Sequence, residues 1–174
     1  MKSSTPPDED RDIRERIIAM VEERGIPADR ASVILSQCKA FVTDQLLVAQ
    51  TAQEAGYRLT DFKTDDQFEL SFNIKSGKYD VGFISKGWDA PGFRIGETLL
   101  VRSDQLSLFR AKADELMNLC ARNGVALSGT RCAEGLELAF DAVIFQEGLN
   151  SKTFGDTAEA VSECVDLAAG ILGL

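Results

Sequence analysis

The sequence predicts an α+β domain in which an antiparallel sheet of about five to six strands packs against helices. Residues 67–75 alternate without a break between apolar and polar side chains, which is the period of a strand with one buried face. Residues 10–24 and 28–55 repeat their apolar side chains at helical spacing. Helix and strand signals come in blocks, in the order α-α-β-β-β-α-β-β-α, with room for a fourth strand before the third helix. Blocks of this kind are typical of α+β proteins.

The N-terminal part of the chain contains a polar tail and two helices. Residues 1–10 are polar and include two prolines, so we expect a disordered tail ahead of a single domain over residues 11–174. Gly25 ends the first helix. The second helix carries two apolar stripes side by side, and a face this wide indicates burial either against the sheet and the first helix or against another subunit. The stripes comprise Ile34, Cys38, Phe41, Gln45, Val48 and Ala52, and Leu35, Val42, Leu46 and Ala49.

The strand pair in the middle of the chain is the clearest structural signal. Residues 57–62 predict a short strand that leads into it. In the alternating run that follows, one face carries Phe68, Leu70, Phe72 and Ile74. A second alternating run begins at Tyr79, and Gly77 between the runs can adopt the positive φ of a tight hairpin turn. We therefore expect an antiparallel pair whose apolar face is covered by helices and whose polar face meets water.

The C-terminal half repeats the scheme with a helix, a strand pair and a helix. Residues 93–101 predict a strand, and Ser103 is a suitable N-cap for a helix that ends at Asn123-Gly124. Residues 125–132 and 136–145 predict a strand pair. The alternation shifts phase near residues 141–142, which predicts a bulge. Residues 148–155 predict a loop, and residues 156–159 have the capping-box spacing of a last helix.

The charge balance limits the classes of partner. The formal charge of the 174-residue chain is −9, from 28 acidic and 19 basic residues. An acidic surface repels phosphate backbones, so we expect no nucleic-acid partner. The N-terminus lacks the apolar run of a signal peptide, and no segment approaches the ~20 apolar residues that span a bilayer. We therefore expect a cytoplasmic protein that does not associate with membranes.

The sequence contains no recognisable catalytic or metal-binding constellation. There is no histidine, which excludes Ser-His-Asp and Cys-His nucleophile systems and histidine metal sites. Asp65-Asp66 falls in a predicted turn, where water prevents the pKa splitting of a catalytic carboxylate pair. Ser85-Lys86 cannot form a dyad because neighbouring strand residues point to opposite faces. We expect no catalytic residue, no bound metal and no cofactor.

The four cysteines are expected to be reduced core residues. No two of them have metal-ligand spacing, and each lies in an apolar context where a thiol behaves as a small hydrophobe. They are Cys38, Cys120, Cys132 and Cys164.

The irregular stretch of residues 86–92 contains the candidate partner-binding residues. Trp88 is the only tryptophan. It is interpreted either as an exposed anchor for a protein partner or as a plug for the end of the core, since tryptophan is mostly buried on average. Phe93 and Arg94 follow it and complete the candidate set. Arg94 suits an acidic group, although a solvated strand face explains it equally well.

The segment Gln53-Glu54-Ala55-Gly56-Tyr57, followed by paired strands, resembles the start of the YbjN-type fold, whose members resemble type III secretion chaperones. In that family a helix ends in Ala-Gly-Tyr before a meander, and a later helix ends near Asn and Gly before a strand pair. Residues 30–174 follow this plan, whereas the first helix and the Trp88 loop depart from it. The resemblance implies a non-catalytic module, often a homodimer, that holds an extended segment of another protein. It transfers no functional residues.

Three functions therefore remain open at the level of sequence. The first is a chaperone-like or regulatory protein-binding module that acts as a homodimer. The second is a small-molecule-binding or enzymatic domain on the same sheet, which requires a polar pocket. The third is an acidic subunit or immunity-type partner of a basic protein, whose binding weakens with salt.

Overall fold

The computed structural model of the chain describes residues 8–64, 70–77, 79–87 and 90–174. Its internal contacts divide the chain into two compact units, one ending at Asp44 and one running from Gln45 to Leu174. The sequence predicts a single domain over residues 11–174 and no boundary at position 44. The reason is that the helical pattern of residues 28–55 continues through this position without a break. Most of the expected disordered tail lies outside the described residues, and residues 8–10 are helical.

The first unit consists of α1 (Asp8–Glu23) and the larger part of α2 (Ala28–Glu54). Gly25, with φ of 60°, ends α1 as predicted, and the backbone N–H of Ile26 donates to the Val21 carbonyl at 3.1 Å in the manner of a Schellman motif. Within residues 10–43, Ala31 is the only apolar residue whose side chain is buried. Ile17, Val21, Ile26 and Phe41 are half-buried, so the helix pair has only a small core of its own.

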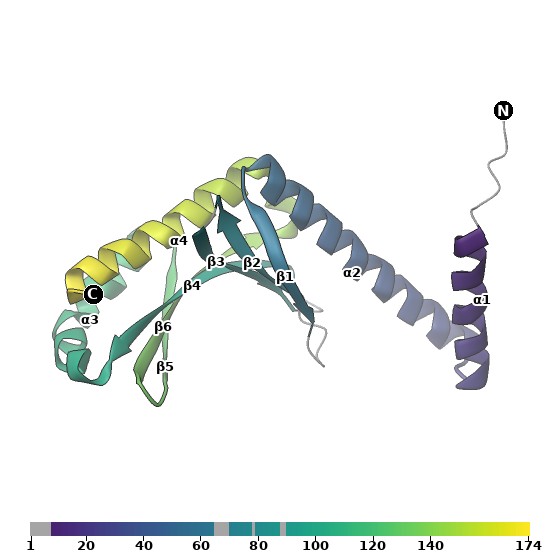
Figure 1. Ribbon diagram of the computed structural model, residues 1–174, viewed down its shortest axis with the longest axis horizontal. Helices are drawn as coiled ribbons and strands as arrows, with labels where there is room; N and C mark the ends of the chain where they lie inside the picture. The colour runs from purple at the N-terminus through teal and green to yellow at the C-terminus, as the bar shows by residue number, and fades with distance from the viewer. Residues whose placement is uncertain (1–7, 65–69, 78, 88–89) are drawn as a thin grey trace. The chain divides into compact units, whose positions relative to one another are not determined.

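The second unit is an antiparallel sheet covered by helices, which confirms the predicted α+β class (Figure 1). The strands are β1 (Arg58–Thr64), β2 (Leu70–Ser76), β3 (Tyr79–Lys86), β4 (Gly92–Arg102), β5 (Ala126–Arg131) and β6 (Gly135–Phe145), in the spatial order β1-β2-β3-β4-β6-β5. The helices α3 (Leu106–Arg122) and α4 (Ser151–Leu172) lie on one face of this sheet (Figure 1). We call this the covered face and the other the open face.

The core lies between the covered face and α4. Burial of about 25 cal/mol per Å² of apolar surface makes this layer the main source of stability. The largest fully buried side chains are Phe93, Phe140, Phe154, Ile74, Ile84, Ile95, Leu116, Leu138, Leu172, Val48, Val101 and Val161. The rings of Tyr57 and Phe154 pack together, with their centroids 5.7 Å apart. The predicted core role of Leu70 and Ile74 is confirmed, while Phe72 is half-buried and Phe68 lies outside the described residues.

The predicted bulge in the last strand is wrong. All eleven residues of β4 pair in unbroken register with β6. Ala142 and Ile144 therefore share the covered face with Phe140, and Val143 and Phe145 point to the open face, where 56% and 62% of their surface is exposed.

Two predicted helix starts are also corrected. Ser103 does not cap a helix, because its hydroxyl donates to the Glu134 carbonyl at 3.2 Å and a short 3-10 turn precedes α3. The last helix begins within the predicted loop. Asn150 Oδ1 accepts from the Thr153 N–H at 3.0 Å, and the Asn150 N–H donates to Thr153 Oγ1 at 3.1 Å. This reciprocal cap satisfies two backbone donors and starts α4 at Ser151.

Candidate functional site

The three candidate residues from the sequence have different environments. Trp88 lies outside the described residues. Phe93 is fully buried on the covered face, where the Lys86 ammonium lies 5.2 Å from its ring centroid. Its side chain packs in the core and is not accessible to a partner, which corrects the expectation that Phe93 is a contact residue. Arg94 remains exposed on the open face, with its guanidinium 5.6 Å from the Phe83 ring centroid.

Arg94 lies beside exposed apolar side chains that the sequence pattern does not predict. Across β4 and β6 it pairs with Val143, and two residues further along β6 lies Phe145. The Phe83 ring covers the backbone of Gly96, where an added Cβ would lie 2.7 Å from the ring. We call Phe83, Arg94, Val143 and Phe145 the sheet patch. It places aromatic and aliphatic surface beside one cation, a combination enriched in protein interfaces.

A second apolar surface runs along α2. Ile34, Leu35, Cys38 and Val42 lie within about 100° of helix circumference at 100° per residue. All four are exposed, Leu35 by 46% and Val42 by 51%. We call these four residues the α2 stripe. Leu35, Cys38 and Val42 follow one another at spacings of three and four residues, as successive positions of a coiled-coil seam do.

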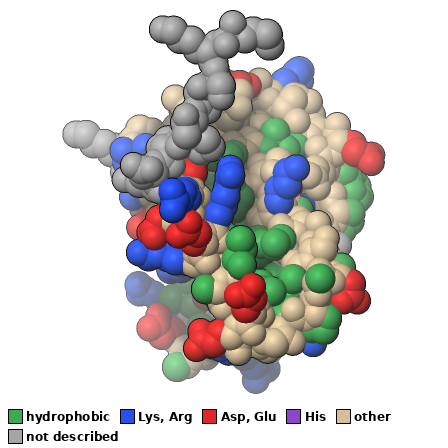
Figure 2. Space-filling model, turned by 90° about the vertical axis from the view of Figure 1, so that its right-hand side faces the viewer, with side chains coloured by type: hydrophobic (Ala, Val, Ile, Leu, Met, Phe, Trp, Pro, Cys, Tyr) green, Lys and Arg blue, Asp and Glu red, His purple; other side chains and the backbone are tan. Residues whose placement is uncertain are grey.

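The α2 stripe lies in a nearly uncharged segment. Lys39 is the one charged residue between positions 31 and 43, although the chain carries 28 acidic and 19 basic residues. A hollow of about 480 Å³ beside the stripe is lined by Val21, Ala28, Ala31, Ser32, Leu35, Ser36 and Lys39. Figure 2 shows hydrophobic side chains reaching the surface in groups bordered by charged ones. Exposed apolar side chains in such numbers mark interaction surfaces more often than solvated ones.

The cysteines divide into two kinds, which corrects the expectation that all four lie in the core. Cys38 and Cys132 are exposed, and Cys120 and Cys164 are buried. Burial, and next the neighbouring Cys164, raise the pKa of the Cys120 thiol to about 11. This thiol is protonated at neutral pH and unsuited to nucleophilic catalysis.

Glu97 is an acidic side chain on the covered face. Burial raises the pKa of its carboxyl group, and the negative charge of Asp166 on α4 raises it further. Its Oε2 atom is buried and accepts no hydrogen bond from any residue that the structure describes. An ionised Glu97 carboxylate therefore lowers the stability of the folded protein, because burial removes water from its charge.

Replacing Glu97 with glutamine is expected to stabilise the protein at neutral pH. The folded pKa lies above the ordinary value of 4.5, so folding favours the protonated form. The contribution of protonated Glu97 to the stability of the fold is fully present below pH 4.5 and is lost as the pH rises through the folded pKa. Partial solvent screening reduces the effect, so we expect a Tm increase at pH 7 on the order of 2 °C. Glu137→Gln, an exposed glutamate on β6, controls for the lost charge, and a Tm difference unchanged at acid pH would contradict the assignment.

The described residues lack a cluster of metal-ligating side chains and a membrane-spanning helix. Within residues 8–64, 70–77, 79–87 and 90–174, no three Cys, Asp or Glu side chains come together in a group able to hold a metal ion. None of the helices in that same part of the chain combines the length and the apolar character needed to cross a membrane.

Comparisons of the chain with protein-family models, with curated proteins and with solved structures find no match.

Proposed function

We propose that this protein is a non-catalytic protein-binding module that acts as a homodimer and holds a segment of a partner protein. The observation that carries the proposal is the α2 stripe, four exposed apolar side chains on one side of a helix that belongs to a pair with only a small core of its own. Such a pair gains most of its stability from apolar contacts outside itself.

A second copy of the same chain is the occupant that best suits this stripe. Two copies with a charge of −9 each repel one another, and an interface forms most readily where that charge is absent. The segment from 31 to 43 contains only Lys39 as a charged residue. An apolar stripe on a helix can also pair with the same stripe of a second copy, as a two-fold symmetric interface requires.

The sheet patch is the proposed contact for a partner segment. It lies in the second unit, so its use does not compete with the α2 stripe for the same side chains. Arg94 adds positive charge beside the Phe83 and Phe145 rings, which suits a carboxylate or a backbone carbonyl of a partner segment. The resemblance to YbjN-type proteins and type III secretion chaperones supports the same function, as a fold-level analogy.

Replacing Leu35 and Val42 together with aspartate is expected to convert the dimer into a monomer. Buried aspartates within an apolar seam lose their hydration without gaining a partner. Light scattering coupled to size exclusion should give twice the chain mass of 19.0 kDa for the native protein and a single chain mass for the variant. A monomeric native protein at micromolar concentration would exclude the proposed dimer.

The control variant lies on the same helix. Val33 is 56% exposed but lies about 160° around α2 from Leu35, so Val33→Asp should leave the dimer intact.

Cys38 allows a second test of the dimer, by chemical crosslinking. A bifunctional maleimide should link two chains of the native protein and of the Cys132→Ser variant, whereas Cys38→Ser should abolish the link. Crosslinking that depends on Cys132 instead would move the interface to the second unit.

A further inference from the structure

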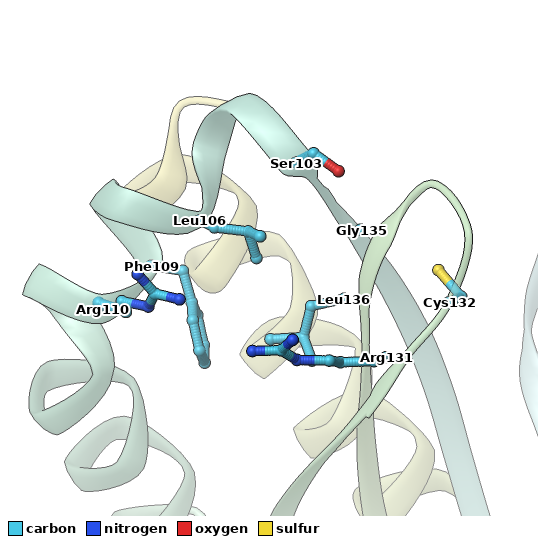
Figure 3. Close-up of a pocket in the computed structure, with 8 residues that line it drawn as sticks. All are labelled: Ser103, Leu106, Phe109, Arg110, Arg131, Cys132, Gly135 and Leu136. Carbon is cyan, nitrogen blue, oxygen red and sulfur yellow. The ribbon is translucent and has the colours of Figure 1, made fainter.

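A pocket at one end of the sheet shares no lining residue with either proposed surface. It has a volume of about 390 Å³, within the range of small-molecule sites. Its walls come from the start of α3, the end of β5 and the start of β6 (Figure 3). The lining residues are Ser103, Leu106, Phe109, Arg110, Arg131, Cys132, Gly135 and Leu136.

Two arginines meet at this pocket from different elements. Arg110 comes from α3 and Arg131 from β5, and both guanidinium groups lie beside the Phe109 ring in Figure 3. Neither makes an ion pair with a carboxylate of the described residues. In a chain with 28 acidic side chains, two neighbouring arginines without an acidic partner leave positive charge available for a ligand.

The remaining surface of the pocket is largely apolar. The Phe109 ring lies between the two guanidinium groups in Figure 3, and Leu106 and Leu136 add aliphatic surface to the lining. The pocket also lies at the N-terminal end of α3, a helix of 17 residues, where the helix dipole adds partial positive charge. An apolar cavity with a few convergent polar groups is the usual form of a binding site.

We propose that this pocket binds an organic anion, in which a carboxylate lies between Arg110 and Arg131 and an attached apolar group packs on Phe109 and Leu136. A carboxylate suits the fork of a guanidinium, which can donate two parallel N–H bonds to it. The apolar group replaces water against the ring and the leucines. The same chemistry is available from a free small acid or from a chain end of a peptide.

This inference does not depend on the proposed dimer. The pocket lies within the second unit and the α2 stripe within the first. Failure of the dimer test leaves the pocket unaffected, and failure of ligand binding leaves the dimer unaffected.

Binding of phenylacetate to the whole protein tests the proposal, with phenylacetamide as its uncharged counterpart. We expect phenylacetate to shift the amide NMR signals of Gly135 and Leu136 and to bind at least about ten-fold more tightly than phenylacetamide, because charge-assisted hydrogen bonds are lost with the charge. Inorganic phosphate, which lacks the apolar group, should bind more weakly than phenylacetate. Equal affinity for the amide, or no shift at these residues, overturns the proposal.

Arginine variants identify the groups that hold the anion. Arg110→Gln and Arg131→Gln should each weaken phenylacetate binding about ten-fold or more. Arg122→Gln removes a positive charge from the last turn of the same helix, outside the pocket, and should leave the affinity unchanged. An equal loss in all three variants would show a non-specific charge effect and overturn the proposal.

Two peptide ligands distinguish the sources of the anion. The first is a short peptide that ends in phenylalanine with a free carboxylate, and the second is the same peptide with an amidated end. Tighter binding of the free-acid peptide than of phenylacetate assigns the pocket to the end of a protein segment. Binding of phenylacetate without the peptide assigns it to a free acid. Both results support the anion pocket.

Discussion

Replacing Phe140 with alanine is expected to lower the free energy of unfolding by about 3–5 kcal/mol, the usual cost of removing a buried phenylalanine ring. Phe140 is fully buried in the middle of β6. Its neighbours across the ladder are Glu97 of β4 and Leu127 of β5. Both neighbouring strands hold the site in place, so the structure cannot collapse fully into the space that the ring leaves.

Phe145→Ala is the matched control for this prediction. It removes the same ring from the same strand, but from the open face, where the side chain is largely exposed. Its expected cost is within about 0.5 kcal/mol. Urea denaturation followed by circular dichroism measures both values. Losses of similar size in the two variants would show that the two faces of β6 have been assigned wrongly.

The middle of the chain could be predicted from the sequence because its pattern was unambiguous. In β2 every second side chain is apolar, and the structure buries Leu70 and Ile74 on the same face. The turn at Gly77, which has φ of 61°, also follows from residue type alone. Local pattern and tertiary burial agree in this segment.

The end of β6 could not be predicted in the same way. Residues 139–145 read Ala-Phe-Asp-Ala-Val-Ile-Phe, so apolar side chains occupy both faces and a period of two does not decide between them. The register between β6 and β4 decides which face each of these side chains occupies. That register depends on contacts between residues far apart in sequence. The predicted bulge near residues 141–142 would place Val143 and Phe145 on the apolar face, so it hid the exposed apolar part of the sheet patch.

The pocket had no signal in the sequence. Arg110 and Arg131 lie 21 positions apart on a helix and a strand, and neither stands in a motif. They meet because the chain turns at Gly124, with φ of 67°, and brings β5 back beside α3. The lack of histidine, by contrast, restricted the possible chemistry from the composition alone.

Replacing Gly135 with alanine is expected to destabilise the protein by more than about 3 kcal/mol, because the substitution combines a steric clash with backbone strain. A Cβ atom at this position would lie 2.2 Å from the Val101 carbonyl oxygen and 3.0 Å from backbone atoms of Arg102. These are main-chain atoms and cannot rotate away. The φ of 155° at Gly135 lies in a region that L side chains rarely adopt.

Gly170→Ala is the control for a glycine-to-alanine change as such. Gly170 lies on α4, and an added Cβ there would meet nothing within 4 Å. The change should stabilise the protein by about 0.5–1 kcal/mol, since alanine favours the helix and restricts the unfolded chain. Because Gly135 begins β6 and lines the arginine pocket, its replacement should also weaken phenylacetate binding under conditions where the variant is folded. A Gly135→Ala variant as stable as the native protein would mean that β4 and β6 do not approach each other so closely at this end of the sheet.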